Sequence, residues 1–177
     1  MKVVVGLPQH PVVIIIIIII IIIIIIIIII RADTPVVKES QGLNRTDDKR
    51  PDGLTVVPWH SGRSATWDVT VVHTQATPYI EQSAIDAGSA AVVAYERKSA
   101  KYSNLSSNHV FYPVAIGTLG VLADEAHEFI TEIGRRASQC TADPRETTFL
   151  YQRISIAIQR FTSVSLSNTF SISEFSL

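Results

Sequence analysis

Two apolar runs in the middle of the chain, separated by a short polar segment, predict neighbouring strands. They extend from Leu54 to Trp59 and from Ala65 to Val72, and Ser61-Gly62-Arg63 provides the turn between them. One aspartate, Asp52, stands at the entry to the first strand, and another, Asp68, stands within the second. The pattern therefore predicts a hairpin that brings two carboxylates close together.

Side chains of a strand alternate between its two faces, and this assigns the residues of the second strand to opposite sides of the sheet. Asp68 shares its face with Thr70 and Val72. The other face carries three apolar residues, Trp67, Val69 and Val71. Asp68 is therefore expected on the opposite side of the sheet from Trp67.

Five further elements complete the predicted fold around this hairpin. Val36–Lys38 is a short edge strand, and Val110 to Leu119 is a buried strand. A helix runs from Thr77-Pro78 to Tyr102, with the threonine as cap and the proline at the first position. Two amphipathic helices follow, one after Asp124-Glu125 and one from a capping box at Asp143-Pro144-Arg145-Glu146 to Gln159. Strands on either side of a long helix predict an α/β fold, a mixed sheet flanked by helices.

The N-terminal segment is of a different kind. Ile14 to Ile30 is an unbroken run of isoleucine, which as a helix with Val12 and Val13 spans about 28 Å, the thickness of a bilayer's hydrocarbon core. Either the run is a transmembrane anchor, which places the protein in a membrane, or it is a translated triplet repeat, which leaves the protein in the nucleus or cytoplasm. Residues 1–31 are accordingly a low-complexity segment, 36–162 a domain, and 163–177 a Ser-rich tail that we expect to be poorly ordered.

Composition excludes several classes of function. The formal net charge of −1 supplies no general basic surface for non-specific nucleic-acid binding. A single cysteine, Cys140, excludes an internal disulfide and a cysteine-based zinc site. The five histidines include no pair spaced four apart, the arrangement that would place two ligands on one helix face. A zinc enzyme is therefore not expected.

The candidate chemistry lies in the two aspartates and in the end of the long helix. Two carboxylates brought together across a hairpin can hold a hard divalent cation such as Mg²⁺ through oxygen ligands. Lys98 and Lys101 stand late in the helix, within reach of the same site. Tyr102 shares a helix face with Lys98, and it either helps to position the lysine or is a packed aromatic at the helix end. The structural alternative is a turn aspartate (Asp52), a strand aspartate (Asp68) and two solvated lysines.

A set of short segments in a fixed order also points to a known family. These segments are Lys38-Glu39 with Gly42-Leu43, Lys49-Arg50-Pro51-Asp52-Gly53-Leu54-Thr55, Val57-Pro58-Trp59, Trp67-Asp68-Val69-Thr70-Val71-Val72, Ala87-Gly88, Arg97-Lys98, Lys101-Tyr102, Pro113-Val114-Ala115, Thr118-Leu119-Gly120, Gly134-Arg135-Arg136 and Gln152-Arg153. From Val36 to about Arg160 the chain resembles the restriction-endonuclease-like C-terminal domain of non-LTR retrotransposon reverse transcriptase polyproteins. It is most similar to the degraded genomic copies of that domain.

The resemblance implies a fold similar to the PD-(D/E)xK nucleases and metal-dependent cleavage of DNA, with Mg²⁺ or Mn²⁺ as cofactor. It implies that Asp52 and Asp68 are the metal ligands. It also implies that Lys98 or Lys101 orients or activates the attacking water and stabilises the charge that grows on the phosphate. DNA would be the partner.

Three departures from the family pattern argue against full activity. Thr70 occupies the place of the motif lysine, Gly117 occupies a place where relatives carry glutamate, and the isoleucine run replaces a helix that often contributes an acid. Three functions therefore stay open at the level of sequence. The chain is a weak or inactive endonuclease-like domain, a single-pass membrane protein anchored by Ile14 to Ile30, or a non-catalytic nucleic-acid-binding module.

Overall fold

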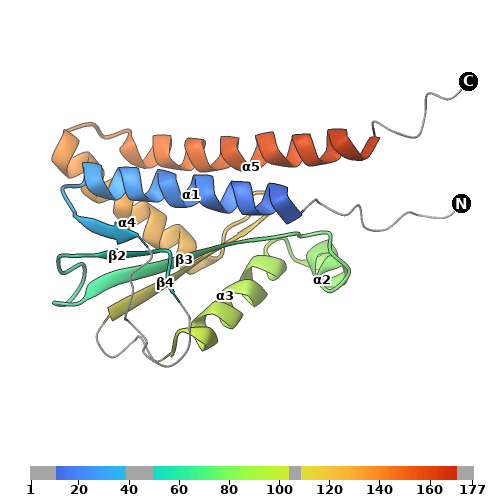
Figure 1. Cartoon of the computed structure of the whole chain (residues 1–177), viewed down its shortest axis with the longest axis horizontal. Helices are drawn as coiled ribbons and strands as arrows, with labels where there is room; N and C mark the ends of the chain where they lie inside the picture. The colour runs from blue at the N-terminus through green and yellow to red at the C-terminus, as the bar shows by residue number, and fades with distance from the viewer. Residues whose placement is uncertain (1–10, 39–49, 104–108, 171–177) are drawn as a thin grey trace, which may run out of the picture.

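The computed structural model describes residues 11–38, 50–103 and 109–170 (Figure 1). Along the chain the elements are α1 (Pro11–Arg31), β1 (Val36–Lys38), β2 (Gly53–Thr55), β3 (Ser64–Val72), α2 (Ile80–Ile85), α3 (Ser89–Lys101), β4 (His109–Gly117), α4 (Asp124–Thr141) and α5 (Glu146–Phe170). Lys49, most of the loop predicted after Tyr102 and the last seven residues of the predicted tail lie outside the described residues.

The four strands form one mixed sheet in the order β1-β2-β3-β4. The pairs β1–β2 and β2–β3 are antiparallel, whereas β3 and β4 run parallel and place Asp68 opposite Pro113. The predicted turn between β2 and β3 is confirmed, and Ser61 and Gly62 both have positive φ. Strand β2 ends at Thr55, although the hairpin strand was predicted to continue to Trp59. After Thr55 the chain bends away, and the Thr55 hydroxyl donates to the Val57 carbonyl at 2.9 Å.

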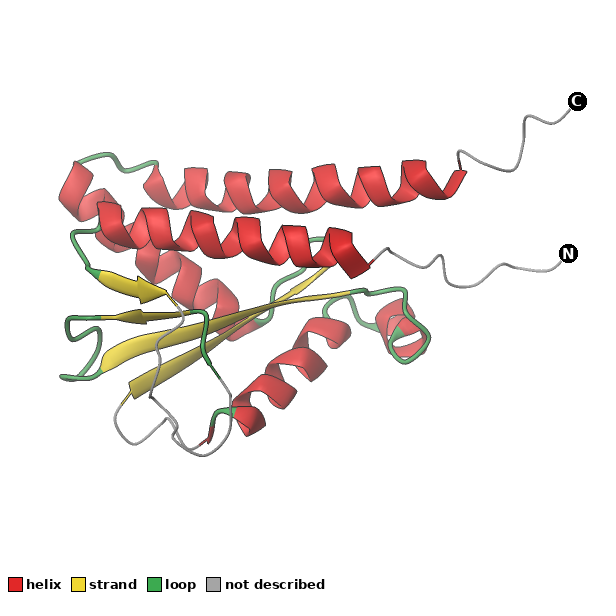
Figure 2. Cartoon of the chain, viewed as in Figure 1, coloured by secondary structure: helices red, strands yellow, loops and turns green. Residues whose placement is uncertain are grey.

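Helices cover both faces of the sheet (Figure 2), which confirms the α/β class with a mixed sheet. One face lies against α1 and α4, and α3 packs on the other. The outermost layer is α5, which packs on both α1 and α4 and runs antiparallel to α1 (Figure 1). The order of strands and helices after the isoleucine run agrees with the prediction, except that the structure has two helices, α2 and α3, where one was predicted.

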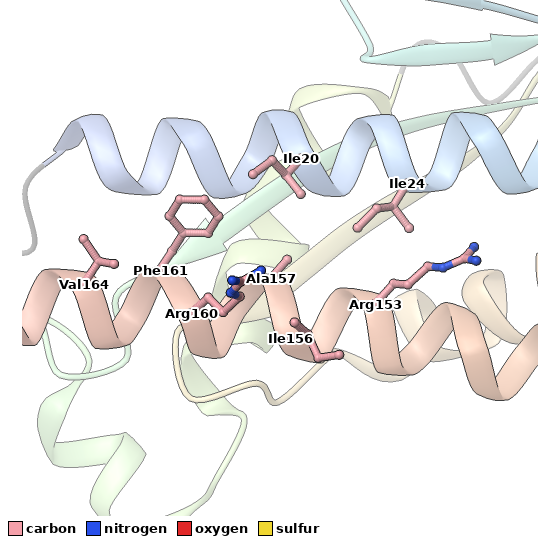
Figure 3. A pocket seen from close by; sticks show the side chains of 8 residues that line it. All are labelled: Ile20, Ile24, Arg153, Ile156, Ala157, Arg160, Phe161 and Val164. Atoms are coloured by element: carbon pink, nitrogen blue, oxygen red, sulfur yellow. The ribbon is translucent and has the colours of Figure 1, made fainter.

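An apolar side chain along their length and an ion pair at one end join α1 and α5. Phe161 of α5 points toward α1 (Figure 3). At the other end Arg31 Nη2 lies 2.7 Å from Glu146 Oε1, within ion-pairing distance but without hydrogen-bond alignment. Glu146 is almost fully buried, and it was predicted to close a capping box on Asp143. That prediction is wrong, because the carboxylate turns inward to Arg31 and α5 begins only at Glu146.

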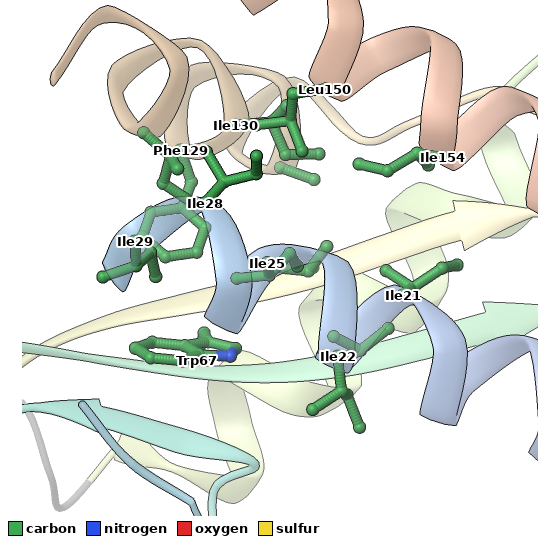
Figure 4. Close-up of a cluster of buried hydrophobic side chains, with 14 of the residues drawn as sticks. Ile21, Ile22, Ile25, Ile28, Ile29, Trp67, Phe129, Ile130, Leu150 and Ile154 are labelled. Atoms are coloured by element: carbon green, nitrogen blue, oxygen red, sulfur yellow. The ribbon is translucent and has the colours of Figure 1, made fainter. Parts of the chain in front are cut away.

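The isoleucine run forms one side of the main hydrophobic core (Figure 4). Its buried members recur with the period of an α-helix and pack above Trp67 and Phe129 of β3 and α4; they are Ile17, Ile21, Ile22, Ile25, Ile28 and Ile29. In a homopolymer this division into a buried and an exposed face comes entirely from the rest of the fold. The run thus covers one face of the sheet together with α4.

The same helix is long and apolar enough to cross a membrane, from Val12 to Arg31. About two fifths of that stretch, 39%, is buried inside the fold, and core helices of this length and composition satisfy the same criterion. The membrane-anchor hypothesis therefore stays a prediction.

Two helix predictions need correction. The helix expected from Thr77-Pro78 to Tyr102 is broken at residues 86–88, where Gly88 takes φ +121° and starts α3 afresh. The last helix was expected to end at Gln159, followed by a poorly ordered tail, whereas α5 continues to Phe170. Serine has only modestly unfavourable helix propensity, so a Ser-rich sequence did not require the helix to stop.

Candidate functional site

Asp68 lies in the middle of β3, on the face opposite the isoleucine core, and its side chain meets α3. The residue is only 4% exposed. Lys98 of α3 forms an ion pair with Asp68 Oδ2, and the Tyr102 hydroxyl donates to Asp68 Oδ1 at 3.1 Å. A carboxylate so far from water requires such partners, because burying an unpaired charge is strongly unfavourable. The lysine that the sequence predicted near Asp68 is therefore brought to it by the structure.

Tyr102 makes a polar contact with Asp68 that the sequence did not predict. Its ring packs 4.6 Å from that of Phe111, as predicted for a packed aromatic. Its hydroxyl also lies 3.1 Å from both Asp68 Oδ1 and the Arg50 carbonyl oxygen, so its single proton serves one acceptor at a time. The signal for this role was its spacing of four from Lys98, which places both side chains on one face of α3.

Lys101 contacts the Tyr102 hydroxyl and not, as Lys98 does, the Asp68 carboxylate. Its ammonium donates to the Tyr102 hydroxyl at 3.1 Å and sits 4.7 Å from the centre of that ring. The lysine itself is exposed. Of the two candidate lysines, the structure thus brings Lys98 to Asp68 and brings Lys101 to Tyr102.

Asp52 is held against β3 by its backbone and its side chain together. Its amide donates to the Trp67 carbonyl at 2.9 Å, and its Oδ2 accepts from the Val69 amide at 2.6 Å. The next residue is Gly53, where a Cβ would collide with the Trp67 indole, so only glycine allows β2 to come this close. The Asp52 carboxylate is thereby fixed beside the residue that follows Asp68.

Asp52 and Asp68 are the carboxylates that could bind a hard cation which keeps most of its own water. Asp52 precedes β2 and Asp68 lies in β3. Mg²⁺ is usually bound by one or two carboxylates, with water and substrate phosphate completing its shell. A protein cage is not present, because no group of three or more histidine, cysteine, aspartate or glutamate residues is found among the described residues. Two ligands are therefore what this part of the chain offers.

The departures from the nuclease pattern each have a structural counterpart. Thr70 lies on the same face as Asp68, and its buried hydroxyl has no hydrogen-bond partner in the described part of the chain. At Gly117 a Cβ would lie 2.9 Å from Thr74 Oγ1, so a glutamate there would displace Thr74. The isoleucine helix lies on the far side of the sheet and contributes no acid. No third carboxylate reaches the site from these positions.

Comparison with known proteins adds no independent assignment. No protein-family model matches the chain, and no curated protein matches it. The resemblance to retrotransposon endonuclease domains consequently rests on the ordered sequence motifs alone.

Proposed function

We propose that this chain is a retrotransposon-derived endonuclease-like domain, with metal-dependent DNA cleavage as its ancestral reaction and weak or absent cleavage now. The observation that carries the proposal is the ion pair of Lys98 with Asp68 beside the bound carboxylate of Asp52. Lys98 of α3 pairs with Asp68 of β3, and Asp52, just before β2, accepts from the amide of Val69, the residue after Asp68. A restriction-endonuclease-like fold is part of the same proposal, and the mixed sheet with helices on both faces supports it.

Each residue has a chemical task in this proposal. Asp52 and Asp68 would hold Mg²⁺ or Mn²⁺, which supplies Lewis-acid stabilisation of the phosphate and a more acidic bound water. The Lys98 ammonium, which now donates to Asp68, is close enough to donate to a phosphate oxygen bound beside that carboxylate. Tyr102 orients Asp68 through its hydroxyl.

Low activity follows from what the site lacks. If only the two carboxylates found among the described residues bind the cation, it depends on water and on the DNA phosphate for its remaining ligands, so affinity without DNA is expected to be poor. Lys98 also neutralises Asp68, and a cation must compete with that ion pair. Both effects reduce the fraction of protein that carries a cation.

The test is nicking of supercoiled plasmid by the full chain in Mn²⁺, since α1 is part of the core and removing it would expose the part of the sheet that α1 covers. The expected result is slow nicking that falls by at least about a hundred-fold in Asp52→Asn, Asp68→Asn and Lys98→Met. Asp86→Asn, which changes an exposed aspartate of the α2–α3 connection, is the matched control and should nick like the parent. Circular dichroism establishes that every variant is folded.

Two other outcomes separate the competing functions. A folded parent chain that binds a DNA duplex at low salt without nicking it, and binds equally well as Asp52→Asn, would be a non-catalytic nucleic-acid-binding module. A folded chain that neither nicks nor binds DNA would exclude both nucleic-acid functions.

A further inference from the structure

The outward face of α1 is an exposed apolar stripe that the fold leaves uncovered. Its members recur at helical spacing and are each between 38% and 56% exposed; they are Val12, Ile15, Ile16, Ile19, Ile23, Ile27 and Ile30. At 1.5 Å per residue the stripe is about 27 Å long. Contiguous apolar surface of this extent is typical of an interaction site rather than of free protein surface.

The neighbouring helix extends this surface and adds charge of one sign. A groove of about 450 Å³ runs between α1 and α5 and is lined by Ile20 and Ile24 on one side and by Ile156 and Val164 on the other (Figure 3). Two arginines of α5, Arg153 and Arg160, also line it; they stand seven residues apart on the same side of that helix.

Negative charge is missing from this part of the molecule. Within residues 12–30 and 147–164, the only charged side chains are Arg153 and Arg160. Glu146, the first residue of α5, is almost fully buried and paired with Arg31 at 2.7 Å. Asp33 and Asp143 lie beyond the helix ends, and Asp143 is paired with Arg145 at 3.0 Å. The surface is therefore apolar along its length and purely cationic at its edge.

We propose that the paired outer faces of α1 and α5 dock in the plane of a bilayer rich in anionic phospholipid. An apolar helix face bordered by arginines is the arrangement by which interfacial helices bind membranes, burying isoleucine among the acyl chains while guanidinium groups meet phosphate headgroups. The buried face of α1 stays in the protein core, so the helix lies along the membrane and does not cross it. This role is independent of the nuclease proposal, because Asp68 and Lys98 lie on the opposite side of the sheet.

The first measurement is flotation of the full chain with vesicles of phosphatidylcholine mixed with phosphatidylserine, beside vesicles of phosphatidylcholine alone. Binding to the mixed vesicles that weakens as salt rises is the expected result. Arg153→Gln combined with Arg160→Gln should weaken it about thirty-fold, since each arginine near an anionic surface contributes about a factor of five to ten. Arg97→Gln combined with Arg135→Gln removes the same charge from other exposed sites and should leave binding unchanged.

A second pair of variants tests the apolar part. Ile19→Ser with Ile23→Ser changes two half-exposed residues of the stripe and should abolish binding. Val37→Ser with Val92→Ser changes two residues of nearly equal exposure elsewhere and should not. Because all four side chains are half-exposed, neither pair is expected to unfold the protein.

Four results would overturn the proposal. Absence of binding to either vesicle, or equal binding to both, would remove the role of anionic lipid. Concentration-dependent dimers in lipid-free solution that Ile19→Ser with Ile23→Ser dissolves would mean that a second copy of the chain covers the stripe. A red shift of tryptophan emission on vesicle binding would mean that α1 leaves the core above Trp67 and inserts across the bilayer.

Discussion

The packing of α1 makes a sharp prediction, because two chemically identical isoleucines two positions apart have opposite environments. Ile25 is fully buried in the core, whereas Ile23 is 46% exposed. The two substitutions Ile25→Ala and Ile23→Ala remove the same atoms from the same helix. Any difference between them therefore reports how the helix faces the rest of the protein.

The expected magnitudes follow from burial and from helix propensity. Truncating a buried isoleucine to alanine usually lowers the free energy of unfolding by about 2–5 kcal/mol, because the transfer term is lost and a cavity is left. Alanine is the better helix former by a few tenths of a kcal/mol, which offsets a small part of that loss. At Ile23 the lost burial is about half as large and leaves no cavity, so the net change should lie within about 1 kcal/mol of zero.

The assay is urea denaturation of the full chain followed by tryptophan fluorescence, with thermal unfolding as a second measure. For a chain of this size each kcal/mol shifts the melting temperature by about 2–4 °C, so Ile25→Ala should melt about 5–15 °C lower than Ile23→Ala. If Ile25→Ala fails to fold, Ile25→Val keeps the comparison, with an expected loss of about 0.5–1.5 kcal/mol.

Equal effects at the two positions would refute the reasoning. They would mean that the isoleucine helix holds no fixed register against β3 and α4, or that it is not packed on the domain in solution. A larger effect at Ile23 would mean that the helix is rotated and that the exposed stripe has been misassigned.

Two further predictions concern α4. Glu132 accepts hydrogen bonds from Arg135 and Arg136, and these bonds, with that of Arg135 the stronger influence, lower the pKa of Glu132 to about 2. The contribution of the Glu132 carboxylate to stability should therefore be complete above pH 4.5 and fade as pH falls toward 2. The difference in urea midpoint between the parent and Glu132→Gln should narrow over that range. A difference that widens as pH falls would contradict the stabilising role of the two arginines. Gly134→Ala should lower the free energy of unfolding by about 1–3 kcal/mol, although alanine favours helix, because its Cβ would lie 2.6 Å from the Thr147 Cα of α5. A higher free energy of unfolding, measured by urea denaturation, would show that the two helices can separate without loss of stability.

Much of the sheet could be predicted because its signals are local. The period-two pattern of β3 assigned Asp68 and Trp67 to opposite faces, and the Ser61-Gly62 turn marked the hairpin through its tolerance of positive φ. Helical spacing likewise assigned Lys98 and Tyr102 to one face of α3. These rules need only a few neighbouring residues, which is why the sequence was sufficient for them.

Element ends were less predictable because tertiary contacts decide them. Whether the alanine-rich segment before Tyr102 forms one helix or two depended on Gly88, whose neighbour Val121 comes from a different part of the fold. Glu146 satisfied a capping pattern, yet its carboxylate pairs with Arg31, more than a hundred residues earlier in the chain. Such partners carry no signal in the local sequence.

The isoleucine run separates most clearly what each level of description determines. By itself the sequence established an apolar segment long enough for a helix of bilayer length, and it predicted that two aspartates and a lysine lie within reach of one another. A homopolymer has no periodicity of its own, so nothing in its letters distinguishes Ile25 from Ile23. Only the surfaces of β3, α4 and α5 divide the helix into a buried and an exposed face, because burial depends on which neighbours the fold brings to each side.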